Sequence, residues 1–106
     1  MVLGAGPVGA FAIKLLSAGG IRDLTVVEIN KNRLEWARRF GAAILVEKSG
    51  DEALKEIREL YPEGVDVVID AVGSEITRRL AINAVRRVVG LFSLVYMIMK
   101  LGYQVM

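Results

Sequence analysis

The sequence contains neither cysteine nor histidine. This double absence excludes disulfide bonds, Cys/His zinc sites, cysteine nucleophiles and Ser-His-Asp triads built from this chain alone. We therefore assign no catalytic residue and no metal-binding residue to it. The first residues also lack the basic segment and cleavage site of a secretory signal, so we expect a cytoplasmic protein.

A strong excess of charge of one sign is absent too. The 14 basic and 12 acidic residues leave a net charge of +2. The arginines occur as scattered pairs with acidic residues between them, at 38–39, 78–79 and 86–87. We expect these pairs to be solvated helix faces, with no nucleic-acid partner.

Long hydrophobic runs are limited to residues 88–99, VVGLFSLVYMIM. This run is shorter than the about 20 residues that a membrane-spanning helix needs, so we expect no membrane span. We interpret it as a buried fifth strand, and residues 88–106 as an irregular or atypical tail.

Strand-like and helix-like segments alternate along the 106 residues, which we interpret as a single domain over 1–106. Apolar, β-branched segments predict strands, and apolar residues at helical spacing predict helices. Ser49 and Glu52 have the spacing of a capping box. The alternation predicts an α/β fold: a Rossmann-like, doubly wound parallel sheet in three αβα layers, truncated at the first strand. The expected strands are 2–3, 24–27, 43–46 and 65–69, and the expected helices are about 8–18, 31–41, 49–61 and 74–85.

The stretch GAGPVG, residues 4–9, has the spacing of a phosphate-binding turn. Gly4 allows a tight turn, Gly6 lets a pyrophosphate approach the backbone, and Gly9 lets the next helix pack closely on the sheet. The helix N-terminus would direct unpaired N–H groups toward the phosphates. The alternative is a glycine-rich turn that serves close packing only.

Glu28 ends the second expected strand, 19 residues after Gly9. An acidic residue about 20 residues beyond the glycine turn is the usual partner of the adenosine ribose hydroxyls. A carboxylate there would repel the 2′-phosphate of NADP, so we predict NAD as the preferred cofactor. The plainer alternative is an exposed charge at a strand end.

Three stretches together resemble the zinc-containing medium-chain alcohol dehydrogenases: VLGAGPVGAFAIKLLSAGG, LTVVEINKNRLEWARRFGA and GVDVVIDAVGS. The resemblance covers roughly residues 2–85 and implies a Rossmann domain that binds NAD(P). It also implies that the pyrophosphate turn consists of Gly4, Gly6, Pro7, Val8 and Gly9.

By the same resemblance, Glu28 is the ribose-binding acid and Arg33 a basic residue near the adenosine ribose. Ala71, Val72 and Gly73 would line the adenine and the nicotinamide-side ribose. Each has a plainer interpretation: Arg33 also fits a solvated helix charge, which is the safer interpretation, and residues 71–73 also fit an ordinary strand-to-helix turn.

The separate catalytic domain of that family, which supplies the zinc ligands and the proton relay, has no counterpart in this sequence. We therefore expect the NAD-binding part of a zinc-dependent alcohol or polyol dehydrogenase, a hydride-transferring oxidoreductase, as a fragment that is inactive alone. Met1 would fall within the first strand of the complete enzyme. Zinc would belong to the complete enzyme only, and the expected partners are NAD, a catalytic domain or a second copy of the chain.

Two other functions stay open. A stand-alone NAD/NADH-sensing regulatory module also uses a glycine turn followed by an acidic strand end. A non-functional remnant would account for the short first strand and for the apolar run at 88–99, whose exposure would favour aggregation.

Overall fold

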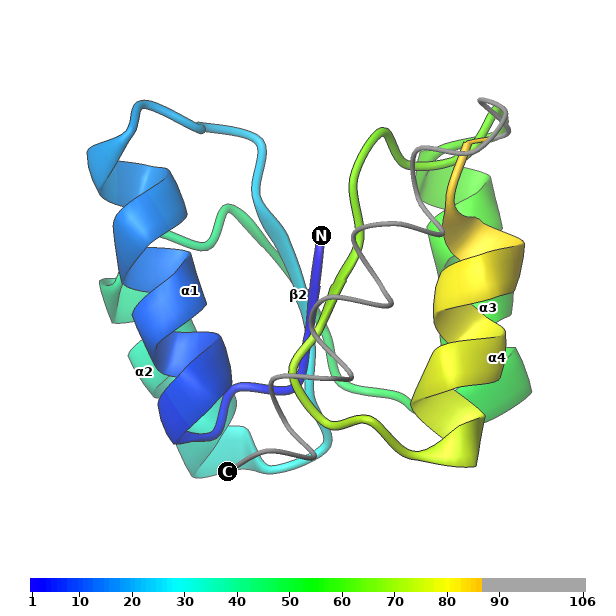
Figure 1. Ribbon diagram of the computed structural model, residues 1–106, viewed down its shortest axis with the longest axis horizontal. Helices are drawn as coiled ribbons and strands as arrows, with labels where there is room; N and C mark the ends of the chain where they lie inside the picture. The colour runs from blue at the N-terminus through cyan, green and yellow to red at the C-terminus, as the bar shows by residue number, and fades with distance from the viewer. Residues whose placement is uncertain (87–106) are drawn as a thin grey trace.

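The computed structural model describes residues 1–86, in which strands and helices alternate strictly (Figure 1). The order follows the one expected from the sequence. The elements are β1 (Val2–Leu3), α1 (Pro7–Ala18), β2 (Thr25–Val27), α2 (Lys31–Arg39), β3 (Ile44–Val46), α3 (Gly50–Leu60), β4 (Ile69–Asp70) and α4 (Glu75–Ala84).

The strands form a parallel four-stranded sheet in the order β3-β2-β1-β4. Val2 of β1 is paired with Val26 on one side and with Ile69 on the other, so β1 lies between β2 and β4. The strand order reverses between β1 and β4. In an open α/β sheet, ligands bind at this reversal, beyond the carboxyl ends of the strands.

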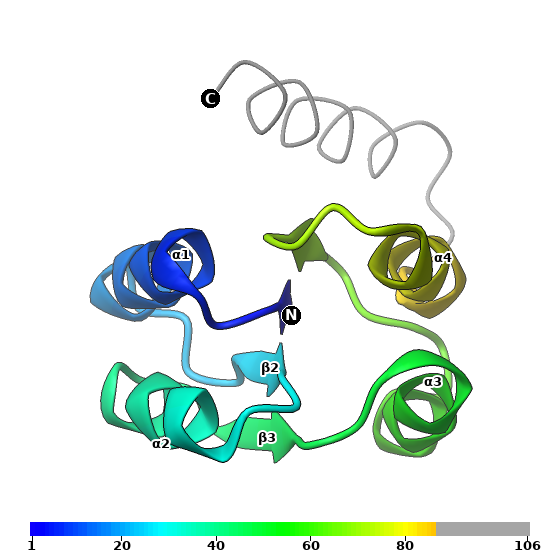
Figure 2. The same cartoon turned by 90° about the horizontal axis from the view of Figure 1, so that it is seen from below.

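Helices cover both faces of the sheet (Figure 2): α1 and α2 lie on one face, α3 and α4 on the other. Because side chains alternate along a strand, neighbouring residues enter different cores. Val2 and Val26 belong to the core beneath α1 and α2, whereas Leu3 and Val27 belong to the core beneath α3 and α4. All four side chains are buried, which explains why these strands are apolar at consecutive positions. The predicted α/β fold is confirmed.

The fourth strand is shorter than the expected 65–69. The chain bends at Asp66, and the backbone before the bend pairs with a different neighbour. The N–H of Val65 donates to the oxygen of Ala84, while the oxygen of Val67 accepts from the amino group of Met1. Regular pairing with β1 therefore starts only at Ile69.

The capping box predicted at the start of α3 was wrong. Ser49 is the N-cap of α3, but its side chain makes no capping hydrogen bond. Gly50, the first helical residue, has a φ of +56°, which departs from the helical geometry that the expected box with Glu52 requires. A capping box instead opens α4, where Ser74 and Thr77 bond reciprocally.

The apolar residues of α1 do not all face the core. Ile13 is fully buried, whereas Val8 and Leu15 are 40% and 58% exposed. The helix packs on the sheet through Gly9 and Ile13. Fewer of its apolar residues are therefore buried than their spacing in the sequence suggests. The fifth strand and atypical tail expected at 88–106 lie outside the described residues.

Candidate functional site

The glycine turn joins β1 to α1 at the carboxyl end of the sheet. Gly4 has a φ of +90°, and a Cβ atom there would lie 2.5 Å from Cγ2 of Val72. A Cβ atom on Gly9 would overlap the carbonyl oxygen of Gly4. These two glycines are therefore required by close packing, whatever the turn binds.

Gly6 is different. Its φ is −70°, which any residue adopts, and the nearest atom to a Cβ there would be Nη1 of Arg33, at 3.8 Å. Nothing in the packing demands a glycine at this position. The missing side chain leaves open space beside the N-terminus of α1, where Pro7 is the first helical residue.

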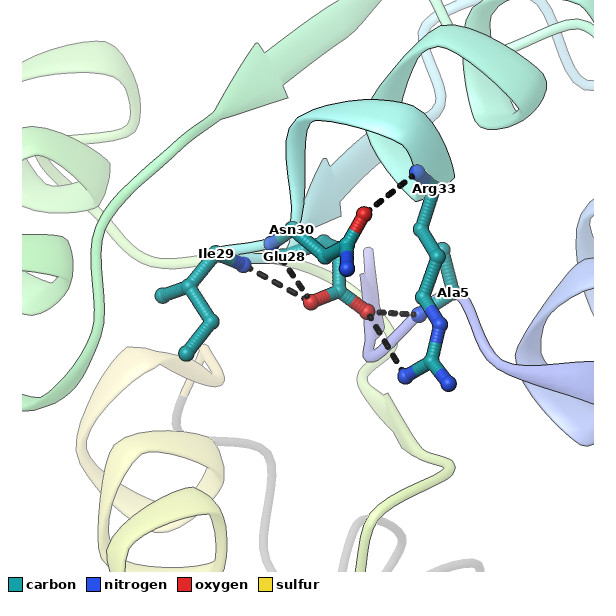
Figure 3. A network of polar contacts seen from close by, with 5 residues as sticks. All are labelled: Ala5, Glu28, Ile29, Asn30 and Arg33. Atoms are coloured by element: carbon teal, nitrogen blue, oxygen red, sulfur yellow. Dashed lines mark hydrogen bonds and ion pairs between the residues drawn. The ribbon is translucent and has the colours of Figure 1, made fainter.

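Glu28 accepts hydrogen bonds from three backbone N–H groups in two segments at this edge (Figure 3). Its Oε1 accepts from the N–H of Ala5 in the glycine turn at 2.9 Å. Its Oε2 accepts from the N–H groups of Ile29 and Asn30 at 2.8 and 3.0 Å. The side chain is only 8% exposed. Glu28 therefore fixes the glycine turn to the end of β2, in contrast to the exposed strand-end charge considered as an alternative.

Arg33 lies in the first turn of α2, which Asn30 caps by accepting a hydrogen bond from the Arg33 N–H at 3.1 Å. Its guanidinium Nη1 is 4.0 Å from Oε1 of Glu28, and the side chain is 55% exposed. The side chain extends toward the glycine turn (Figure 3). Three predicted site residues, Gly6, Glu28 and Arg33, are thus brought together.

Asp70 has the corresponding position at the end of β4, on the other side of β1, and is 6% exposed. Its Oδ1 accepts from the N–H groups of Val72 and Gly73 at 3.0 and 2.9 Å. Its Oδ2 accepts from the hydroxyl of Thr77 at 3.1 Å. The sequence analysis missed Asp70 and Thr77. The Asp at the end of VVID nevertheless parallels the Glu at the end of TVVE.

A pocket of about 470 Å³ opens at this edge of the sheet. Of the predicted residues, Gly4, Glu28, Arg33 and Val72 line it. The other predicted residues do not line it: Gly6, Ala71 and Gly73 belong to the two turns beside it, and Pro7, Val8 and Gly9 form the first turn of α1. The sequence did not single out the rest of the lining: Leu3, Val27, Ile29, Asn30, Lys48, Ser49, Gly50, Ser74, Ile76, Thr77 and Leu80.

Two apolar side chains in this lining are unusually exposed. Ile29 follows Glu28 and is 65% exposed, and Ile76 in the first turn of α4 is 61% exposed. The pocket therefore combines the buried Glu28 carboxylate with apolar walls, as small-molecule sites commonly combine a few polar groups with apolar walls.

Known proteins are similar to this chain in sequence and in fold. Residues 7–100 match the family model described as zinc-binding dehydrogenase. The chain belongs to this family. Zinc-binding dehydrogenases are oxidoreductases, and D-xylulose reductase A of Aspergillus oryzae is 35% identical to the chain over 91 residues, covering 81% of the chain and 25% of the relative.

Two solved dehydrogenase structures are similar in fold and in sequence. Zinc dependent alcohol dehydrogenase 2 from Streptococcus pneumoniae matches with a TM-score of 0.74 at 37% identity, over 80% of this chain and 25% of that one. The 2R,3R-butanediol dehydrogenase from Bacillus subtilis matches with a TM-score of 0.72 at 35% identity, over 80% and 24%. The chain thus spans about a quarter of the length of its relatives.

Within residues 1–86, no helix has the length and apolar character to cross a membrane. In the same part of the chain, no group of three or more Asp or Glu side chains is arranged to hold a metal ion.

Proposed function

We propose that this chain is the NAD-binding part of a zinc-dependent medium-chain alcohol or polyol dehydrogenase. The observation that carries the proposal is the coincidence of three features at one edge of the sheet. They are the open space at Gly6, the buried Glu28 carboxylate and the pocket that β1, β2, the turn after β4 and α4 line. This edge is where open α/β sheets bind nucleotides.

The residues fit a dinucleotide. The first-turn N–H groups of α1 have no intrahelical acceptors, so they are available to a pyrophosphate beside Gly6. Glu28 retains lone-pair capacity on Oε1, which accepts one backbone hydrogen bond, and it would accept from the adenosine ribose hydroxyls. Ile29 and Ile76 would provide apolar walls for the adenine.

Glu28 is also the basis for preferring NAD to NADP. Its buried negative charge would repel a 2′-phosphate on the ribose that it contacts. The positive charge of Arg33 would attract a 2′-phosphate and so oppose this repulsion. Its guanidinium is half-exposed, however, and its nearest carboxylate oxygen is Oε1 of Glu28. Solvent weakens the attraction of such a group for a phosphate.

When bound, the nicotinamide would take up or release the hydride, and the zinc of a complete dehydrogenase would polarise the alcohol oxygen. This chain would hold and orient the cofactor. With no cysteine or histidine it offers neither thiolate nor imidazole to a zinc ion, so the zinc, the substrate pocket and the proton relay would belong to a further domain.

Substitution of Gly6 tests the proposal. Gly6→Ala places a methyl group in the open space without a close protein contact, so we expect the fold to be preserved and NAD affinity to fall about tenfold or more. Calorimetric titration with NAD measures the affinity, and circular dichroism monitors the fold.

Gly19→Ala is the matched control, because Gly19 ends α1 at the other end of the helix and also has a negative φ, −78°. It should bind NAD as the unmodified chain does. An unchanged affinity in Gly6→Ala, or no NAD binding by the unmodified chain, would contradict the proposal.

A further inference from the structure

The turn that follows β4 touches the glycine turn at two points. Val72 packs directly on Gly4, since its Cγ2 atom lies 2.5 Å from the place where a Cβ would be. The methyl group of Ala71 is 3.4 Å from the corresponding place on Gly9. The position of one turn therefore determines the shape of the other.

One carboxylate and one hydroxyl hold the second turn in place. Asp70 accepts from both N–H groups of the Val72–Gly73 segment, and Gly73 has a φ of +76°. The Thr77 hydroxyl donates to the other Asp70 oxygen and accepts from the Ser74 N–H at 3.0 Å. Thr77 belongs to α4, so the pair ties the turn to a packed helix.

We infer that Asp70 and Thr77 act as a positioning pair for the dinucleotide site. They would hold Val72 and Gly73 against the glycine turn, as Glu28 holds that turn from the side of β2. This inference rests on the proposed function, because it concerns the same pocket. A shift of the turn would alter the backbone surface offered to the cofactor, and small misplacements in such sites have large effects.

Asp70 also stabilises its own turn, as Glu28 stabilises the glycine turn. Each of these two carboxylates directs its negative charge at backbone N–H groups. Charge-assisted bonds of this kind are shorter and stronger than neutral ones. Loss of the Thr77 hydroxyl would leave one Asp70 oxygen without the donor that now orients it.

The test compares two threonine substitutions of identical chemistry. Thr77→Val removes the hydroxyl that Asp70 accepts from. Thr25→Val removes the hydroxyl that bonds to the Tyr61 hydroxyl at 2.7 Å, at the start of β2 and away from the pocket. Both variants should lower the unfolding temperature. Thr77→Ser retains the hydroxyl and serves as the rescue variant.

The readouts are the dissociation constant for NAD, from calorimetry well below the unfolding temperature, and the amide resonances of the free chain. We expect Thr77→Val to bind NAD about tenfold more weakly. It should also displace the Gly4, Val72 and Gly73 amide resonances. Thr25→Val should do neither, and Thr77→Ser should restore both.

Each contrary outcome has its own meaning. NAD binding by Thr77→Val within about twofold of the unmodified chain, or equal weakening in Thr25→Val, would overturn the positioning role while the proposed function stood. Absence of NAD binding by the unmodified chain would instead remove the proposed function, and this inference with it.

Discussion

Glu28 and Asp70 end the two strands that flank β1, and each accepts three hydrogen bonds while more than nine-tenths buried. Burying a carboxylate is costly unless hydrogen bonds compensate it. Here all but one of the donors are backbone N–H groups, and the last is the Thr77 hydroxyl. Each side chain therefore stabilises a turn of the candidate site, and Glu28 also lines the pocket that a ligand would enter.

Replacing Glu28 should affect both folding and binding. Glu28→Ala leaves three backbone N–H groups without their acceptor, so we expect a loss of about 1–3 kcal/mol in the free energy of unfolding. NAD affinity should fall, and the discrimination against NADP should shrink. Denaturant unfolding and titration with each cofactor measure the two effects.

Glu35→Ala is the control for that substitution. Glu35 is an exposed carboxylate on α2 that pairs with Arg38 and Arg39, outside the pocket. It should bind NAD normally. Equal binding of NAD and NADP by the unmodified chain would contradict the role assigned to Glu28.

At the scale of the elements, the spacing of apolar residues predicted every helix within residues 1–86. It did not predict which side of each helix is buried. In α2, Leu34 and Ala37, three residues apart, are both buried. In α4, Leu80 and Ala84 are buried, whereas Ile76, four residues before Leu80, lines the pocket. Apolar residues at helical spacing can face either the hydrophobic core or a ligand pocket. Their pattern alone does not distinguish the two.

The packing of α3 gives a prediction about this distinction. Ile57 is fully buried and Leu60, three residues later, is 43% exposed. Ile57→Ala should lower the free energy of unfolding by about 2–5 kcal/mol, because it removes methyl groups from a closed core. Leu60→Ala should lower it by less than about 1 kcal/mol. Urea unfolding of the two variants measures the difference, and similar losses would contradict the placement of α3.

For the whole molecule, the lack of cysteine and histidine predicts that the chain alone does not oxidise alcohols. The chain has no cysteine or histidine, and it spans about a quarter of the length of its relatives. We expect no detectable NADH formation from primary, secondary or polyol alcohols, with zinc supplied. Absorbance of NADH at a high concentration of the chain measures this, with a complete dehydrogenase as positive control. Zinc-dependent alcohol oxidation by the purified chain would contradict the expectation.

Much of the candidate site could be predicted from the sequence because its motifs are short and local. GAGPVG sets the turn, and an acidic residue at the end of the next strand reaches the same edge in any parallel sheet. Asp70 and Thr77 were missed because their importance depends on contacts between the second turn and Gly4. Gly50 likewise has a positive φ, which no residue pattern specified for the start of α3.

The sequence by itself determined the alternating elements, the family resemblance and the exclusion of cysteine and histidine chemistry, since each depends on residue type and spacing. Only the tertiary structure decided that close packing requires Gly4 and Gly9, whereas Gly6 leaves open space beside the helix. It also decided that Glu28 is bonded to Ala5, 23 residues earlier. The physical reason is that close approach and hydrogen bonding act between segments far apart in the chain, and their geometry exists only once the sheet and its helices have packed.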